Sequence, residues 1–286
     1  MDASRLRPLR VGEMVDVAIK IYRQRFGELA RAVAVVVLPV SVLNVLVTLS
    51  TVATVDDDYP FRTTELGEPT PTIDGGDLAA LLGGILVAAV VGWLATQLAT
   101  AACFDIVSGT YVDREPTWRD SLRFAIRKLR SLLWLELLFG LGMLVGLLLC
   151  IGPGVYLYVA WSIAVPVLLF EDLRGAKALG RSRLLLKGRW WPTAGVLVLV
   201  AILGFILGGV IEGVLGGVMA ASDSDLVDAI GGAIAQAGAQ ILTTPLSAAV
   251  TAVIYYDALV RKEGFDLQQL AAGFGVEPPP EVDGLA

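Results

Sequence analysis

The sequence predicts an all-α integral membrane protein with six transmembrane helices arranged as three hairpins. Apolar residues make up 56% of the 286 residues and charged residues only 17%, whereas a soluble domain carries about 25% charged residues. Long stretches almost free of charge alternate with charged segments, and about 20 apolar residues suffice for a helix to cross a bilayer. Basic and acidic residues also occupy different segments, which is typical of a multi-pass membrane protein.

Most of the uncharged stretches have the length of one helix. A longer stretch is interrupted by Ile151-Gly152-Pro153-Gly154, and this turn chemistry predicts two helices joined by a tight hairpin. We therefore expect a single polytopic domain over residues 1–274, followed by a disordered tail at 275–286 that begins near three consecutive prolines. The six predicted spans are about 30–54, 78–108, 131–151, 154–171, 192–219 and 229–259.

The basic residues predict the orientation of these spans. All but one of the 22 Lys and Arg residues lie before or at the very start of the first span, between spans two and three, between spans four and five, or after span six. Arg62 is the exception, and the other loops are acidic. By the positive-inside rule, both termini are expected in the cytoplasm and the protein in the plasma membrane.

A basic segment with an apolar stripe precedes each odd-numbered span, as in an amphipathic helix that lies among lipid headgroups. Each even-numbered span ends with an aromatic residue followed by an acid. These shared features predict a threefold internal repeat, with chance similarity between apolar helices as the alternative. The three stripes are Met14, Ala18, Tyr22 and Phe26; Leu122, Ala125, Leu129 and Leu133; and Leu179, Ser182, Leu186 and Trp190. The three endings are Phe104-Asp105, Phe170-Glu171 and Tyr256-Asp257.

The first candidate site is a collar of acids and basic residues at the cytoplasmic boundary. An acid placed there can pair with an arginine of an adjacent interfacial helix, which we favour over proton or substrate chemistry. The remaining basic side chains can reach lipid phosphates. The predicted collar consists of Arg23, Arg25, Arg127, Arg130, Arg183, Lys187, Arg189, Asp105, Glu171 and Asp257.

The second candidate site is a polar pathway formed by Gln97, Gln236, Gln240 and Thr243. Polar groups inside hydrocarbon require partners, so these residues either line a small cavity or form hydrogen bonds between helices. Small residues at four-residue spacing, at 142 and 146 and at 209, 213 and 217, predict close helix packing. That packing is either within the chain or between copies of a homo-oligomer.

Several motifs resemble a bacterial, actinobacterial-type family named after the membrane domain of glycerophosphoryl diester phosphodiesterases. They are Arg7–Asp16 with Tyr22–Phe26, Ala178–Arg183 with Lys187–Trp191, and Tyr255–Asp257 with Arg261–Asp266. The resemblance covers about residues 5–270. It implies a helical membrane domain, whereas the phosphodiesterase reaction belongs to a separate soluble barrel with catalytic histidines and a metal ion.

We expect a protein that is not an enzyme. The chain has no histidine, which removes the commonest general base and metal ligand, and no nucleophile–base pair or metal-ligand spacing stands out. No cofactor is expected, and the basic residues form no separate nucleic-acid-binding domain. The expected role is a scaffold that binds anionic lipid headgroups or partner proteins at its cytoplasmic face. The alternative is a transporter or lipid-handling protein with a path between the hairpins.

Overall fold

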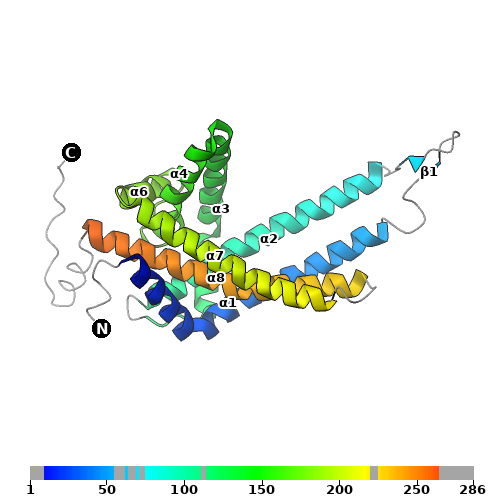
Figure 1. Cartoon of the computed structure of the whole chain (residues 1–286), viewed down its shortest axis with the longest axis horizontal. Coiled ribbons are helices and arrows are strands. Elements are labelled where there is room, and N and C mark those ends of the chain that lie inside the picture. The colour runs from blue at the N-terminus through cyan, green and yellow to red at the C-terminus, as the bar shows by residue number, and fades with distance from the viewer. Residues whose placement is uncertain are drawn as a thin grey trace. The chain divides into compact units, whose positions relative to one another are not determined.

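The computed structural model describes residues 10–54, 62–63, 69–70, 75–110, 114–219 and 225–263. Long helices dominate these residues, and β1 pairs with β2 in antiparallel fashion, with Arg62 opposite Thr70. The expected tail at 275–286 lies outside the described residues. The elements, labelled in Figure 1, are α1 Val11–Thr54, β1 Arg62–Thr63, β2 Pro69–Thr70, α2 Gly75–Gly109, α3 Trp118–Leu149, α4 Ile151–Trp161, α5 Ala164–Phe170, α6 Ala176–Leu186, α7 Trp190–Met219 and α8 Asp225–Glu263.

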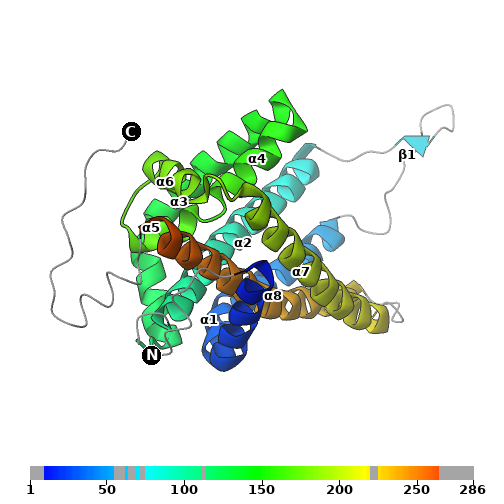
Figure 2. The same cartoon turned by 60° about the vertical axis from the view of Figure 1, so that its left-hand side comes forward.

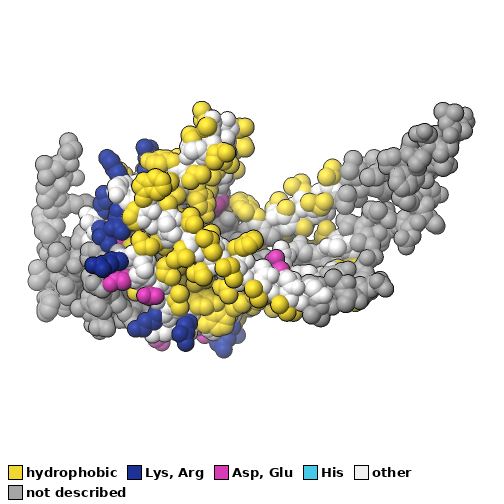
Figure 3. All heavy atoms as spheres, viewed as in Figure 1, with side chains coloured by type: hydrophobic (Ala, Val, Ile, Leu, Met, Phe, Trp, Pro, Cys, Tyr) yellow, Lys and Arg dark blue, Asp and Glu magenta, His cyan; other side chains and the backbone are white. Residues whose placement is uncertain are grey.

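Six of the described helical segments are long and apolar enough to cross a membrane. Many of their large hydrophobic side chains are exposed, including Leu148 at 78% and Phe205 at 82%, and hydrophobic side chains dominate the face shown in Figure 3. Exposure of this extent is tolerated in lipid and not in water, which indicates a multi-pass membrane protein. The segments are Val11–Leu49, Leu82–Gly109, Trp118–Leu149, Ile151–Phe170, Trp190–Leu215 and Ala229–Lys262.

The turn between the third and fourth segments differs from the expected one. Helix α4 starts at Ile151 after the extended residue Cys150, so Gly152, Pro153 and Gly154 form its first turn. Proline is tolerated there because the first N–H groups of a helix have no partner within the helix. The fourth segment is also divided between α4 and α5 at Ser162 and Ile163. Pro166 in the first turn of α5 lacks the N–H that a continuous helix would donate to Ser162.

The three basic segments also differ from one another. The first two are the beginnings of α1 and α3, whereas the third forms the separate helix α6. Gly188, with φ of +87°, lies between α6 and α7 in the left-handed region that glycine enters without a Cβ clash. In the third stripe, Leu179, Ser182 and Leu186 are buried, so α6 packs this face against the protein.

The chain forms two compact units. Unit 1 comprises Met1–Lys20, Trp134–Leu199 and Ala249–Ala286, and unit 2 comprises Ile21–Leu133 and Val200–Ala248. Because the two units interleave along the sequence, they are not consecutive domains, and a single membrane domain over 1–274 stays a prediction.

Unit 1 contains α4, α5 and α6 together with the second part of α3, and α3, α4 and α6 lie together in Figures 1 and 2. Helices α3 and α4 approach closely: a methyl group placed on Gly146 would lie 3.1 Å from the Cα atom of Gly154. Helix α6 is fixed to α4 because the hydroxyl of Ser182 donates a 2.8 Å hydrogen bond to the carbonyl of Ala160. Gly142 and Gly146 therefore allow α3 to pack closely against α4, as their spacing predicts.

Unit 2 contains most of α1, all of α2, the first part of α3, and parts of α7 and α8. Helices α7 and α8 lie near each other at Gly238, where an added methyl group would lie 3.6 Å from the Ile211 side chain. Methyl groups placed on Gly209, Gly213 or Gly217 would meet no described atom within 4 Å. That stripe is therefore not a helix-packing surface within the described part of unit 2.

Candidate functional site: acid–arginine clusters and a polar groove

The acid near the end of α2 is buried and fully hydrogen-bonded. The Asp105 side chain is 5% exposed, and its Oδ1 atom accepts a 2.7 Å bond from Nη2 of Arg114. Its Oδ2 atom accepts a 2.7 Å bond from the Ser121 hydroxyl on α3. A buried carboxylate is tolerated when it is paired and its lone pairs are satisfied, so this cluster links α2, the following turn and α3.

The same turn is held from α1. The backbone N–H of Trp118, at the start of α3, donates a 2.9 Å bond to Oε2 of Glu28, and an anion at a helix N-terminus is favourable. Nη2 of Arg25 donates a 3.1 Å bond to the Pro116 carbonyl. The sequence suggested Arg25 for the collar that binds headgroups or pairs with acids, and here it bonds to the protein itself, with its Nη1 atom also 3.7 Å from Oε1 of Glu115.

The acid that follows α5 lies in a comparable cluster in unit 1. Oε2 of Glu171 accepts a 2.7 Å bond from Nε of Arg181 on α6, and Oε1 accepts a 3.2 Å bond from the Tyr255 hydroxyl on α8. Tyr255 is only 2% exposed, and its ring lies 5.9 Å from that of Phe170. Phe170, the aromatic residue before the acid, therefore packs against the same tyrosine that bonds to Glu171.

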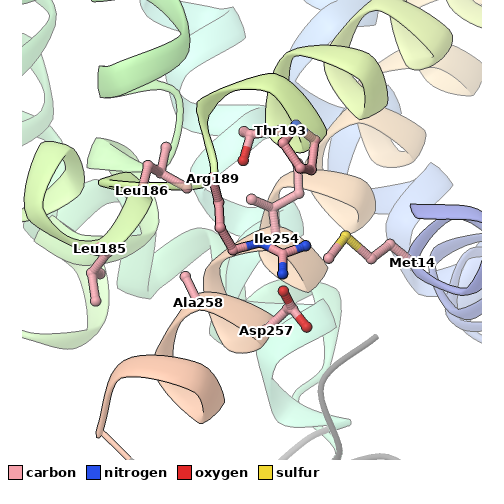
Figure 4. A pocket seen from close by; sticks show the side chains of 9 residues that line it. Met14, Leu185, Leu186, Arg189, Thr193, Ile254, Asp257 and Ala258 are labelled. Atoms are coloured by element: carbon pink, nitrogen blue, oxygen red, sulfur yellow. The ribbon is translucent and has the colours of Figure 1, made fainter. Parts of the chain in front are cut away.

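The acid of α8 pairs within its own helix. Oδ2 of Asp257 accepts a 2.8 Å bond from Nε of Arg261, and the Asp257 side chain is 3% exposed. Figure 4 shows the guanidinium of Arg189 pointing toward Asp257 beside Thr193 and Met14. The pocket they line has a volume of about 10 Å³, which is the scale of a single water molecule.

All three acids are thus neutralised by arginine, but their nearest partners are Arg114, Arg181 and Arg261 rather than the arginines suggested from sequence. Two of these partners follow their acids by 9 and 10 residues across a turn, a spacing that could have identified them. The third follows by four residues on one helix face. Other predicted collar residues are exposed: Arg23, Arg127 and Arg130 in unit 2, and Lys187 and Arg183 in unit 1, the last with its guanidinium 5.9 Å from the centre of the Tyr156 ring.

A polar groove of about 560 Å³ lies in unit 2 between α1, α2 and α8. Gln236 and Gln240 line it as the sequence suggested, whereas Gln97 and Thr243 do not belong to its lining. The Thr243 hydroxyl instead donates to the Ala239 carbonyl of its own helix. The polar lining residues are Ser41, Asn44, Thr48, Thr96, Gln236 and Gln240.

Four of these groove residues were not identified from the sequence. On α1, the positions 41, 44 and 48 are separated by three and four residues and so share one helix face, a periodicity that could have revealed them. Thr96 on α2 is not part of a comparable periodic pattern of polar residues. Its hydroxyl donates a 2.9 Å bond to the carbonyl of Gly92, as is common for Thr inside a membrane helix.

In the part of the chain that the structure describes, no group of three or more His, Cys, Asp or Glu residues is placed to hold a metal ion.

The helical segments and their exposed apolar surface define the class of the protein as a multi-pass helical membrane protein. Within that class, the chain belongs to the family described as a domain of unknown function, DUF8558, whose model matches residues 124–271. The match includes Glu171, Asp257 and the two groove glutamines. No curated protein and no solved structure matches the chain.

Proposed function

We propose that this protein is a non-enzymatic membrane scaffold that binds anionic lipid headgroups through exposed basic residues at its cytoplasmic face. In this arrangement the six spans form three hairpins, both termini are cytoplasmic, and the plasma membrane supplies the lipid. The resemblance to the membrane domain named after glycerophosphoryl diester phosphodiesterases fits such a role without the catalytic barrel.

One observation carries the proposal: the acids at the span ends are already neutralised, and other basic side chains beside the same spans are exposed. Asp105 and Glu171 are bonded to Arg114 and Arg181 at 2.7 Å. Arg127 and Arg130, two of the exposed collar residues, lie in the first part of α3, just before the predicted span at 131–151. Each exposed Lys or Arg close to an anionic membrane surface contributes about 1 kcal/mol to binding.

Native mass spectrometry of protein released from nanodiscs tests this proposal. We expect retention of phosphatidylglycerol over phosphatidylcholine, and about a 25-fold loss of that preference in the double variant Arg127→Gln with Arg130→Gln. Arg62→Gln is the control, because it also removes positive charge but lies in the segment expected on the opposite side. Equal retention of both lipids by the native protein would refute headgroup binding.

The polar groove of unit 2 favours a second candidate function, in which the protein binds or moves a lipid. Proteoliposomes that contain fluorescent lipid analogues test it, with translocation expected in the native protein and reduced in Gln236→Leu with Gln240→Leu. A translocation rate equal to that of protein-free vesicles would rule it out. Phosphodiesterase activity is not expected in either case, and glycerophosphocholine hydrolysis by the purified chain would contradict both.

A further inference from the structure

We propose that the groove of unit 2 binds one uncharged, hydroxyl-bearing lipid of the acylglycerol type, with its polar end at the carboxamides of Asn44, Gln236 and Gln240. The inference deepens the second candidate function, because it names the class of lipid. It is independent of anionic headgroup binding, since it concerns a different set of residues.

The carboxamides are the first argument. Asn44 lies on α1 within a candidate span, and the two glutamines lie on α8 within another. The structure records no hydrogen bond for these three side chains within the described residues, although all three line the groove. An amide in an apolar environment without a partner costs about 1–3 kcal/mol, so an occupant that bonds to them is strongly favoured.

The hydroxyls of the groove indicate the chemistry of that occupant. Ser41 donates its hydroxyl hydrogen to the Val37 carbonyl at 3.1 Å, and Thr48 donates to the Asn44 carbonyl at 2.9 Å. Thr96 donates in the same way to Gly92. The oxygens of Ser41 and Thr96 keep lone pairs that accept hydrogen bonds, and the carboxamides both donate and accept. A ligand with hydroxyl donors and ester acceptors matches this set.

The absence of charge defines the ligand further. No acidic or basic side chain belongs to the lining of the groove, which is made of described residues. A phosphate group placed there would lack a counter-charge, and an unpaired charge inside the bilayer is expensive. An uncharged headgroup avoids that cost.

The remaining walls suit an acyl chain. Apart from Thr96, the α2 side consists of small and aliphatic residues, and Ala88, Ala89, Gly92 and Ala95 leave room that larger side chains would fill. Val40 and Val47 of α1 provide apolar contacts on another side. The volume of about 560 Å³ lies within the range of about 300–1,000 Å³ for small-molecule sites, and accommodates a glycerol unit and the first part of its chains.

Photocrosslinking with a diacylglycerol that carries a photoactivatable acyl chain tests the inference on the full chain in phosphatidylcholine nanodiscs. Labelled peptides are identified by mass spectrometry. We expect labelling in 40–48, 85–96 and 236–240, competition by unlabelled dioleoylglycerol, and no competition by phosphatidylglycerol. The double variant Gln236→Leu with Gln240→Leu should label about 25-fold less, from about fivefold for each lost hydrogen bond.

Gln97→Leu with Thr243→Val is the control, because it removes a carboxamide and a hydroxyl outside the groove lining, and its labelling should equal that of the native protein. Gly92→Leu gives a second variant that retains the carboxamides. A Cβ atom at Gly92 meets no atom within 4 Å, and Gly92 belongs to the groove lining, so a leucine side chain there should take up groove volume and abolish labelling.

Labelling spread evenly over the spans, equal competition by phosphatidylglycerol, or full labelling of Gly92→Leu would each overturn the inference. Labelling confined to the groove without lipid translocation in proteoliposomes would support it, while refuting transport as the function. The experiments therefore distinguish a failure of groove binding from a failure of lipid transport.

Discussion

The hydroxyl of Tyr255 on α8 bonds to Oε1 of Glu171 at 3.2 Å, although the two residues are 84 positions apart in the sequence. Arg181 occupies the other carboxylate oxygen at 2.7 Å. The acid that ends the fourth candidate span thus joins α5, α6 and α8 within unit 1. This bond explains why a tyrosine stands at a fully buried position, since a buried hydroxyl requires a partner.

Tyr255→Phe should lower the free energy of unfolding by about 1.5–3 kcal/mol. The substitution keeps the ring contact with Phe170 and removes one hydrogen bond to a carboxylate, whose typical contribution is in this range. Thermal or denaturant unfolding of the detergent-solubilised protein measures the change. Tyr158→Phe is the control, because Tyr158 is 51% exposed and should change stability by less than about 0.5 kcal/mol. Equal stability of Tyr255→Phe and the native protein would show that the bond contributes nothing.

Asp105→Asn should destabilise unit 2 by about 2 kcal/mol. The amide cannot accept the charge-assisted bond from Arg114 as the carboxylate does, and the loss of one member of a buried pair leaves the other poorly compensated. We place the effect below that of a fully buried pair because the Arg114 side chain is 59% exposed. Unfolding monitored by hydrogen exchange of α2 and α3 reports it locally.

The matched control for Asp105→Asn is Asp120→Asn on α3. The Asp120 side chain is 61% exposed, and its carboxylate lies 3.6 Å from Arg123. Exposed pairs of this kind contribute about 0–1 kcal/mol. If the two substitutions lowered stability equally, burial would not be the reason for the strength of the Asp105 cluster.

The helical class and the six apolar segments follow from the sequence, because the length of an uncharged stretch and the thickness of a bilayer determine them together. The division of the fourth segment into α4 and α5 was not predicted, since Pro166 could equally have kinked one continuous helix. The acids were identified because each follows an aromatic residue at the end of a stretch. The arginine partners of these acids depend on the geometry of the turns, which the local sequence pattern does not determine.

The candidate polar pathway was identified only in part, for a related reason. Helix periodicity shows which residues share a face but not which face meets a neighbouring helix. Gln97 and Gln236 look equivalent in the sequence, and only the packing of α2 and α8 places the second in the groove and leaves the first outside its lining. Polar residues of α1 completed the groove, and they were missed although their spacing of three and four residues places them on one helix face.

Gly175→Ala should destabilise unit 1 by about 2 kcal/mol or more. Gly175 has φ of +56° and ψ of −127°, a conformation that glycine adopts freely but that costs about 1–3 kcal/mol for a residue with a Cβ atom. The added methyl group would also lie 2.8 Å from Nε1 of Trp134, so the indole must move. Denaturant unfolding in detergent measures the loss. Gly180→Ala within α6 is the control, since it meets no atom within 4 Å and gains about 1 kcal/mol of helix propensity.

Gly146→Ala should weaken the packing of α3 against α4. The added methyl group would lie 3.1 Å from the Cα atom and 3.2 Å from the backbone nitrogen of Gly154, and neither atom can move away by rotation of a side chain. The helices must separate by a few tenths of an ångström, at a cost of about 1–3 kcal/mol. Gly140→Ala on the same helix meets no atom within 4 Å and should be neutral or stabilising, by up to about 1 kcal/mol. Denaturant unfolding of both variants in the same detergent separates the two effects, because helix propensity acts equally at positions 140 and 146 whereas the close approach exists only at 146. If Gly146→Ala proved as stable as Gly140→Ala, the small-residue spacing of α3 would not be required for its contact with α4.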